Sequence, residues 1–190
     1  MASGTTLGSC SVPLSTDGKS GFLTFGSVAG PGEAAELRVV SPDTKSVMVQ
    51  IYDPVAASAA KGASWIGGAH LEVWGGGADT VGALKRADLS QVAVDLDGTL
   101  HVVGKAETPK VSHWRTKDEK GRPVTMLLLQ WGDGSQFAVG MAVSYSQSTN
   151  GKQSRLITTV PMEHGVPVFV PGIGGTQTNC AIRNGRLEIQ

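Results

Sequence analysis

The chain has 190 residues, 16 Lys and Arg against 16 Asp and Glu, and a formal net charge of zero. A neutral chain without a basic run offers no general attraction for a polyanion, so nucleic acid is not expected as a partner. The apolar share of 40% supports one hydrophobic core. No apolar run approaches the about 20 residues of a spanning helix, which excludes a transmembrane helix. We expect residues 1–20 to form an N-terminal surface segment and residues 21–190 to form a single domain.

Two cysteines, Cys10 and Cys180, lie near opposite ends of the chain. A disulfide between them would close a very long loop. In the chain-entropy model, such a loop stabilises the folded state by about 4–5 kcal/mol. An even cysteine count placed this way favours an oxidising compartment, and the sequence therefore predicts a periplasmic or secreted protein. Two alternatives stay open: separate buried thiols, or a lipidation signal at residues 7–10.

Alternating apolar and polar residues predict many short strands. Residues 46–53 place Val47, Val49 and Ile51 on one face, and residues 69–74 direct Leu71 and Val73 inward. The clearest alternation spans residues 136–145, with a small-residue outer face. Further strands are predicted at 124–130, 154–160 and 166–170, and a hairpin at 92–102. Asp-Gly and Asn-Gly pairs separate them, as two-residue turns require; they begin at residues 17, 97, 133, 150 and 184.

Helical patterns are scarce, with short turns predicted only at 54–62 and 82–89. Many short strands with few helices indicate a sandwich architecture. The sequence predicts an all-β fold, an antiparallel β-sandwich of jelly-roll type with one or two short helical turns.

Residues 92–100 resemble the first motif of haloacid-dehalogenase-type phosphatases. The resemblance implies that Asp95 is a nucleophile and Asp97 a general acid, acting with Mg²⁺ at the end of a parallel strand. The later family motifs do not follow, because no Lys or acidic pair comes after Thr158 and Thr159. A strand, an Asp-Gly turn and a second strand explain the segment more simply.

Other patterns predict neither catalysis nor a cofactor. None of His70, His101, His113 and His164 is paired at metal-ligand spacing. Gly-x-Ser-x-Gly and phosphate-binding loops are absent from the sequence. A haem ligand within residues 162–164 is an alternative to a plain loop. We therefore predict no catalytic residue, no metal and no cofactor.

The tryptophans give the most specific functional signal. Trp65 lies in a Gly-rich loop, Trp114 lies between His113 and Arg115, and Trp74 is expected on the outer face of its strand. Exposed indoles can stack on the apolar faces of sugar rings, while flanking polar groups bond the hydroxyls. These five residues are the predicted ligand-binding set. The alternative is that the rings cap the open ends of a core.

Several segments resemble family 9 carbohydrate-binding modules and the related DOMON-type sandwiches. Residues 47–53 resemble an early core strand that ends in an acidic residue, and residues 69–74 resemble the next strand, with Ala69 where that family often has Asp. Residues 143–146 and 153–159, around the Asn150-Gly151 turn, resemble a closing hairpin. The resemblance covers about residues 36–160 and implies a β-sandwich that binds sugars through paired tryptophans.

The leading hypothesis is an exported, non-catalytic, lectin-like protein whose partner is a glycan or polysaccharide. The alternative is a structural or assembly protein that associates with itself. Its docking surface would be the small-residue face of Ala138, Gly140 and Ala142, and low charge density would favour association. A phosphatase is the third hypothesis.

Overall fold

Strands dominate the computed structural model. It describes residues 6–7, 23–26, 35–43, 45–75, 82–83, 89–135, 137, 140–159, 162–163, 166–169, 180–183 and 186–189. The strands in these ranges are β1 (Thr6–Leu7), β2 (Leu23–Gly26), β3 (Glu36–Asp43), β4 (Ser46–Tyr52), β5 (His70–Gly75), β6 (Gly82–Ala83), β7 (Ser90–Asp95), β8 (Leu100–Val103), β9 (Lys110–Lys117), β10 (Pro123–Gln130), β11 (Gly140–Thr149), β12 (Lys152–Thr158), β13 (Met162–Glu163), β14 (Val166–Phe169), β15 (Cys180–Arg183) and β16 (Arg186–Ile189). A single-turn 3-10 helix, η1 (Trp65–Gly67), precedes β5.

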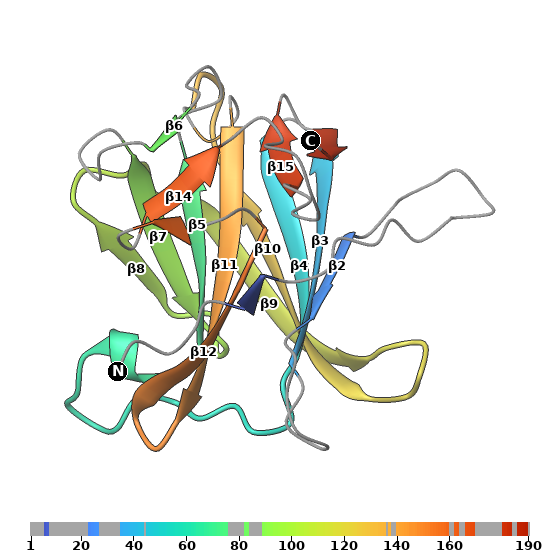
Figure 1. The fold of residues 1–190 in the computed structure, drawn as a ribbon, viewed down its shortest axis with the longest axis vertical. Helices are drawn as coiled ribbons and strands as arrows, with labels where there is room; N and C mark the ends of the chain where they lie inside the picture. Colours follow the sequence, from blue (N-terminus) through green and yellow to red (C-terminus); the bar gives the residue numbers. More distant parts are fainter. Residues whose placement is uncertain are drawn as a thin grey trace.

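Two large sheets form the layers of a sandwich (Figure 1). The first runs in the order β1-β12-β11-β5-β7-β8, with β15 and β16 attached through β11. The second runs in the order β2-β3-β4-β10-β9, which leaves β9 at its edge. A small sheet of β13, β14 and β6 completes the described strands. Apart from the short β1–β12 pair, the pairings are antiparallel, and the prediction of an all-β antiparallel sandwich is confirmed.

The core lies between the two large sheets, because each contributes its alternate apolar side chains to one buried cluster. The predicted inward residues of β4 and β5 are all in this cluster and are at most 2% exposed. The main contributors are Leu37, Val39, Val47, Val49, Ile51, Leu127 and Leu129 from one sheet, and Leu71, Val73, Val92, Val94, Met141, Val143, Tyr145 and Ile157 from the other.

Two predicted hairpins are present with the backbone geometry that their turn residues allow. Gly98 has φ +89° between β7 and β8, and the Asp95 N–H donates to the Thr99 carbonyl at 2.9 Å. Between β11 and β12, Asn150 and Gly151 have φ values of 53° and 73°. Positive φ at both central residues is the geometry of a two-residue hairpin turn. The phosphatase-like motif therefore lies on a hairpin, and β7 is antiparallel to both neighbours, which excludes the phosphatase hypothesis.

The helical turn predicted at 54–62 is wrong, and a short helical turn is found instead at η1. Residues 54–62 form an irregular loop, in which the Ala57 carbonyl accepts the Ala69 N–H at 2.7 Å. A helix over this segment would need that carbonyl for its own hydrogen bonds. Gly82–Ala83 is a strand, and residues 84–88 lie outside the described residues.

Of the strand predicted at 136–145, the structure shows β11 from Gly140 onward, and residues 136, 138 and 139 lie outside the described residues. The Phe137 N–H donates to Ser135 Oγ at 3.2 Å, a local bond that takes this residue out of the ladder. Its ring stacks on Trp131 with centroids 4.5 Å apart and is fully buried. The expected outer face is also covered, since Ala142 and Ser144 are each 1% exposed. Ala142 is therefore not part of a docking surface, and Ala138 lies outside the described residues.

Within the predicted N-terminal segment, Thr6–Leu7 pairs with β12. The division at residue 20 stays a prediction. No helix in the described ranges has the length and apolar character needed to cross a membrane. Cys10 lies outside the described residues, so the disulfide with Cys180 also stays a prediction.

Candidate functional site

The structure separates the five predicted ligand-binding residues into three places. His113, Trp114 and Arg115 lie on the edge strand β9, Trp65 lies in η1, and Trp74 lies in β5 at the centre of the other large sheet. Only the β9 group is continuous and open to solvent. It is therefore the starting point of the candidate site.

Strand β9 is exposed at each of its last five residues, 113–117. Trp114 is opposite Met126 of β10, whereas His113 is opposite the core residue Leu127. Because side chains alternate along a strand, Trp114 points to the outer face of the sheet, and His113 and Arg115 point to the inner side. The indole, 40% exposed, and the guanidinium therefore do not form one flat platform.

A cavity of about 200 Å³ opens beside Arg115 at one end of the sandwich. It is smaller than the pockets that hold drug-sized ligands and suits a group the size of one ring. Its lining is formed where β4 ends, where β10 begins and where the β7–β8 turn starts: Ile51, Asp53, Pro54, Ala56, Leu96, Arg115, Pro123, Val124 and Thr125. One carboxylate and one guanidinium thus share a cavity with apolar walls.

The Asp53 carboxylate is held in one orientation by groups from another strand. The Tyr145 hydroxyl donates to Oδ2 at 2.7 Å, and Gln147 Nε2 donates to Oδ1 at 2.9 Å. Burial of the phenol, together with the negative charge of Asp53, raises the pKa of Tyr145 well above its usual value. The phenol therefore remains a hydrogen-bond donor, and the carboxylate enters the cavity with a fixed direction.

His113 contacts the β7–β8 turn beside this cavity. A Cβ placed on Gly98 would lie 2.5 Å from His113 Nδ1, so only glycine fits the turn at this point. The Thr99 N–H donates to the Asp97 carboxylate at 2.9 Å, which is the main reason that the pKa of Asp97 is lowered. His113 adds a smaller electrostatic contribution in the same direction. The turn thus brings one edge of each large sheet together.

Trp65 belongs to an aromatic and histidine cluster of the other large sheet. Its ring stacks on His101 at 5.1 Å and meets His70 edge-on at 4.8 Å. His101 Nε2 lies 3.0 Å from Asp95 Oδ2. Trp65 is only partly exposed, because part of its ring area is used in these contacts. The structure does not join it to the cavity residues.

Trp74 was expected to be exposed, and this expectation is wrong. The side chain is 2% exposed, and its Nε1 donates to Ser144 Oγ at 3.2 Å. Ser144 Oγ in turn donates to Glu72, which also accepts a bond from Gln91 at 2.7 Å. These buried and partly buried polar groups form hydrogen bonds with one another. Trp74 therefore stabilises the sheet and offers no free ring face to a ligand.

Tyr145 and Gln147 were not predicted as site residues. Asp53, at the end of β4, was recognised as an acidic residue in the resemblance but had no predicted role. That position, directly after an alternating strand, was the available signal for Asp53. No signal linked Asp53 to Tyr145, because 92 positions separate them. Across the described parts of the chain, no group of three or more His, Cys, Asp or Glu side chains could hold a metal ion.

Comparisons with known proteins give matches only among solved structures. No protein-family model matches the chain, and the curated proteins give no match. One matching structure is a family 9 carbohydrate-binding module from Caldicellulosiruptor kristjanssonii in complex with cellotriose. It has 11% identity and a TM-score of 0.46, over 83% of this chain and 78% of that chain. A second, in complex with glucose, has 12% identity and a TM-score of 0.43, over 78% of this chain and 80% of that chain.

Both structures fall in the family that residues 36–160 resemble.

Proposed function

We propose that this protein binds a carbohydrate without transforming it, in the cavity shared by Arg115 and Asp53. The observation that carries the proposal is the pairing of an exposed guanidinium with an oriented carboxylate in a ring-sized cavity. A planar guanidinium donates forked hydrogen bonds, which match vicinal hydroxyls, and a carboxylate accepts hydrogen bonds from hydroxyls. Apolar walls from Ile51, Leu96 and Val124 suit the C–H face of a sugar ring.

The two other β9 residues take supporting roles in this proposal. His113 lies two positions before Arg115 on the same side of β9, against the β7–β8 turn, and can donate to, or accept from, a hydroxyl group. Trp114 offers a stacking surface on the outer side of β9, where it meets only a glycan long enough to pass over the edge strand. A contact between Trp65 and ligand stays a prediction, as does export to the periplasm or beyond the cell. The proposal assigns no catalytic residue.

Calorimetric titration of the full chain with a panel of oligosaccharides tests the proposal. Glucose and cellotriose are natural first probes, since the matching structures hold them. Arg115→Ala should weaken binding of the best ligand by about 10- to 100-fold, the loss expected for hydrogen bonds to a charged group.

Lys152→Ala is the matched control, because it removes an exposed cation from β12 of the other sheet. This variant should bind like the unaltered protein. Absence of binding across neutral and acidic glycans would reject the proposal. Equal affinity of Arg115→Ala and Lys152→Ala would reject the cavity as its site.

A further inference from the structure

The inner side of β9 carries a row of basic residues, His113, Arg115 and Lys117, which we call the basic row. All three are exposed, and the strand contains no acidic residue. Alternate residues on a strand lie about 7 Å apart, so the row forms a line of donors about 14 Å long. Within the described residues, Arg115 and Lys117 form no ion pair.

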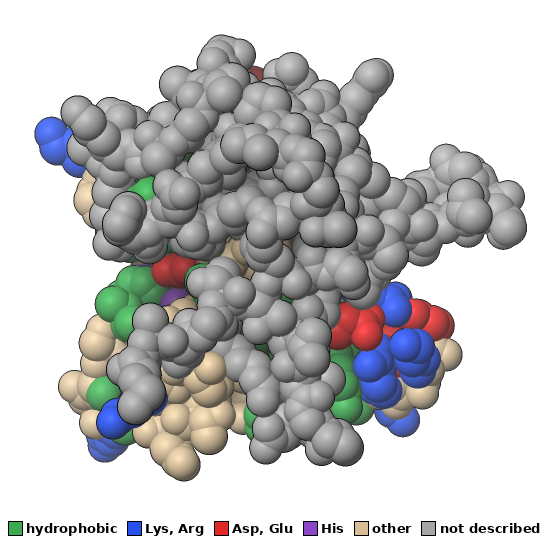
Figure 2. Space-filling view, viewed as in Figure 1, with side chains coloured by type: hydrophobic (Ala, Val, Ile, Leu, Met, Phe, Trp, Pro, Cys, Tyr) green, Lys and Arg blue, Asp and Glu red, His purple; other side chains and the backbone are tan. Residues whose placement is uncertain are grey.

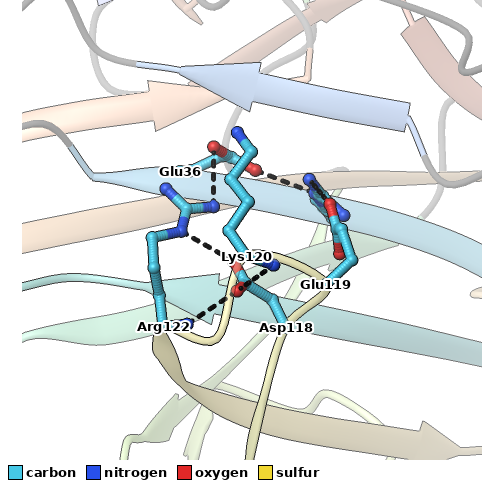
Figure 3. Close-up of polar contacts among 6 residues, drawn as sticks. Glu36, Asp118, Glu119, Lys120 and Arg122 are labelled. Atoms are coloured by element: carbon cyan, nitrogen blue, oxygen red, sulfur yellow. Dashed lines mark hydrogen bonds and ion pairs between the residues drawn. The ribbon is translucent and has the colours of Figure 1, made fainter.

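The acidic residues closest in sequence to the basic row are occupied elsewhere (Figure 3). Asp118 accepts bonds from Arg122 Nε at 2.7 Å and from the Lys120 N–H at 2.9 Å. Glu119 forms an ion pair with Arg38, and this bond is the main cause of a lowered Glu119 pKa.

Glu36 completes this charged cluster and links it to β3. Its Oε1 pairs with Arg38 Nε at 2.8 Å, and its Oε2 with Arg122 Nη2 at 3.2 Å. Three carboxylates thus face two guanidiniums over the β9–β10 hairpin, where charged side chains gather in Figure 2. Lys117 forms no ion pair with these three carboxylates.

Two acidic groups do face the cavity end of the row, and each already accepts hydrogen bonds. Asp53 is bound by Tyr145, Gln147 and the Val55 N–H, and Asp97 by the Thr99 N–H. They suit hydroxyl groups, which can donate to them, whereas a second carboxylate entering the cavity would be repelled. A ligand that follows the row therefore needs hydroxyls at the cavity and negative charge beyond it.

We propose that the ligand is an acidic polysaccharide, a chain whose sugar units carry carboxylates. This inference rests on the proposed carbohydrate-binding function and specifies its substrate class. One sugar unit places its hydroxyls in the cavity. Arg115, which lines the cavity, binds the carboxylate of the next unit in place of vicinal hydroxyls, because its fork matches a planar carboxylate with two parallel bonds. Lys117 adds a point charge for a carboxylate one step along the chain.

The test compares polygalacturonate with its fully methyl-esterified form, which has the same backbone without the charges. The full chain should bind the acidic polymer at least about fivefold more tightly at low salt. This preference should shrink as ionic strength rises from about 0.05 M to about 0.5 M, because screening weakens contacts between exposed charges. Equal affinity for the two polymers would overturn the inference.

Two lysines of β9 provide a matched pair of variants. Lys117→Ala should lower affinity for the acidic polymer by about two- to fivefold, as expected for one exposed ion pair. Lys110→Ala should leave it unchanged, because Lys110 lies on the outer side of the same strand. Equal losses in the two variants would remove the basic row as the cause and overturn the inference.

Further outcomes separate this inference from the proposed function. Binding of neutral oligosaccharides alone would retain the carbohydrate-binding function and overturn the acidic class. Binding of polyglutamate or single-stranded DNA as tightly as polygalacturonate would mean general polyanion binding, and would also overturn it. Absence of binding to every glycan would reject the proposed function itself.

Discussion

Strands β5 and β9 have similar side chains and opposite surroundings. β5 carries His70 and Trp74, and β9 carries His113 and Trp114. β5 lies between β11 and β7, and its tryptophan is 2% exposed. β9 pairs only with β10 among the described strands, and its tryptophan is 40% exposed. Alternation tells which residues share a face of a strand, but the neighbouring elements decide whether that face is open.

The different solvent exposure of the two strands determines whether their polar side chains bond within the protein or remain available for a ligand. Around β5, Trp74 donates to Ser144 and Ser144 donates to Glu72, so these side chains form their hydrogen bonds within the protein. Along β9, Arg115 and Lys117 have no ion-pair partner among the described residues. The first arrangement stabilises the sheet, and the second leaves charge available for a ligand.

Replacing each tryptophan by alanine gives the largest expected contrast. Trp74→Ala should lower the free energy of unfolding by about 3–5 kcal/mol, because it opens a cavity and leaves buried polar groups without a partner. Trp114→Ala should change it by less than about 1 kcal/mol, because its ring already meets solvent. Urea denaturation followed by circular dichroism measures both. Similar losses in the two variants would contradict the comparison of covered and open faces.

Much of the fold was predictable because local signals agreed with one another. Val47, Val49 and Ile51 alternate with polar residues, and the hairpin turns carry glycine where positive φ is needed. The cover over the second face of β5 was not predictable. The side chains on that face bond to groups far away in the sequence, such as Ser144, which lies 70 positions from Trp74.

The candidate site was predictable only in part for the same reason. His113 and Arg115 were predicted because they flank a tryptophan before a charged turn, and Arg115 lines the cavity. The position of Asp53 across that cavity, and its bond to Tyr145, depend on the packing of two sheets. Local patterns in one sequence do not predict contacts between residues that lie so far apart along the chain.

One added carbon atom at Gly98 should disturb the β7–β8 turn, where the edges of the two large sheets meet. Gly98→Ala should lower the free energy of unfolding by about 2–4 kcal/mol, because it combines positive φ with a clash against His113. Gly104→Ala is the matched control: φ is also positive, at +68°, but nothing lies within 4 Å of the added carbon. Its cost should be about 1–2 kcal/mol.

Thermal or urea unfolding of the two glycine variants measures this difference. Adding His113→Ala to Gly98→Ala should recover part of the loss, whereas the same addition to Gly104→Ala should recover nothing. If the paired variants lose the same stability, the turn does not depend on its contact with β9.

The smallest expected effect concerns the covered side of the cavity, where Tyr145 holds Asp53. Tyr145→Phe should lower the free energy of unfolding by about 1–2 kcal/mol at pH 7, through loss of one hydrogen bond to a carboxylate. The native pKa of Tyr145 is raised, so above pH 10 the unfolded chain releases this proton and the folded chain keeps it. The unaltered protein should therefore lose about 1.4 kcal/mol more per pH unit than the variant does. The difference in the free energy of unfolding between the two proteins, measured by urea titration, should close as the pH rises from 10 to 11. A constant difference would show that this phenol ionises as easily in the native state as in the unfolded chain.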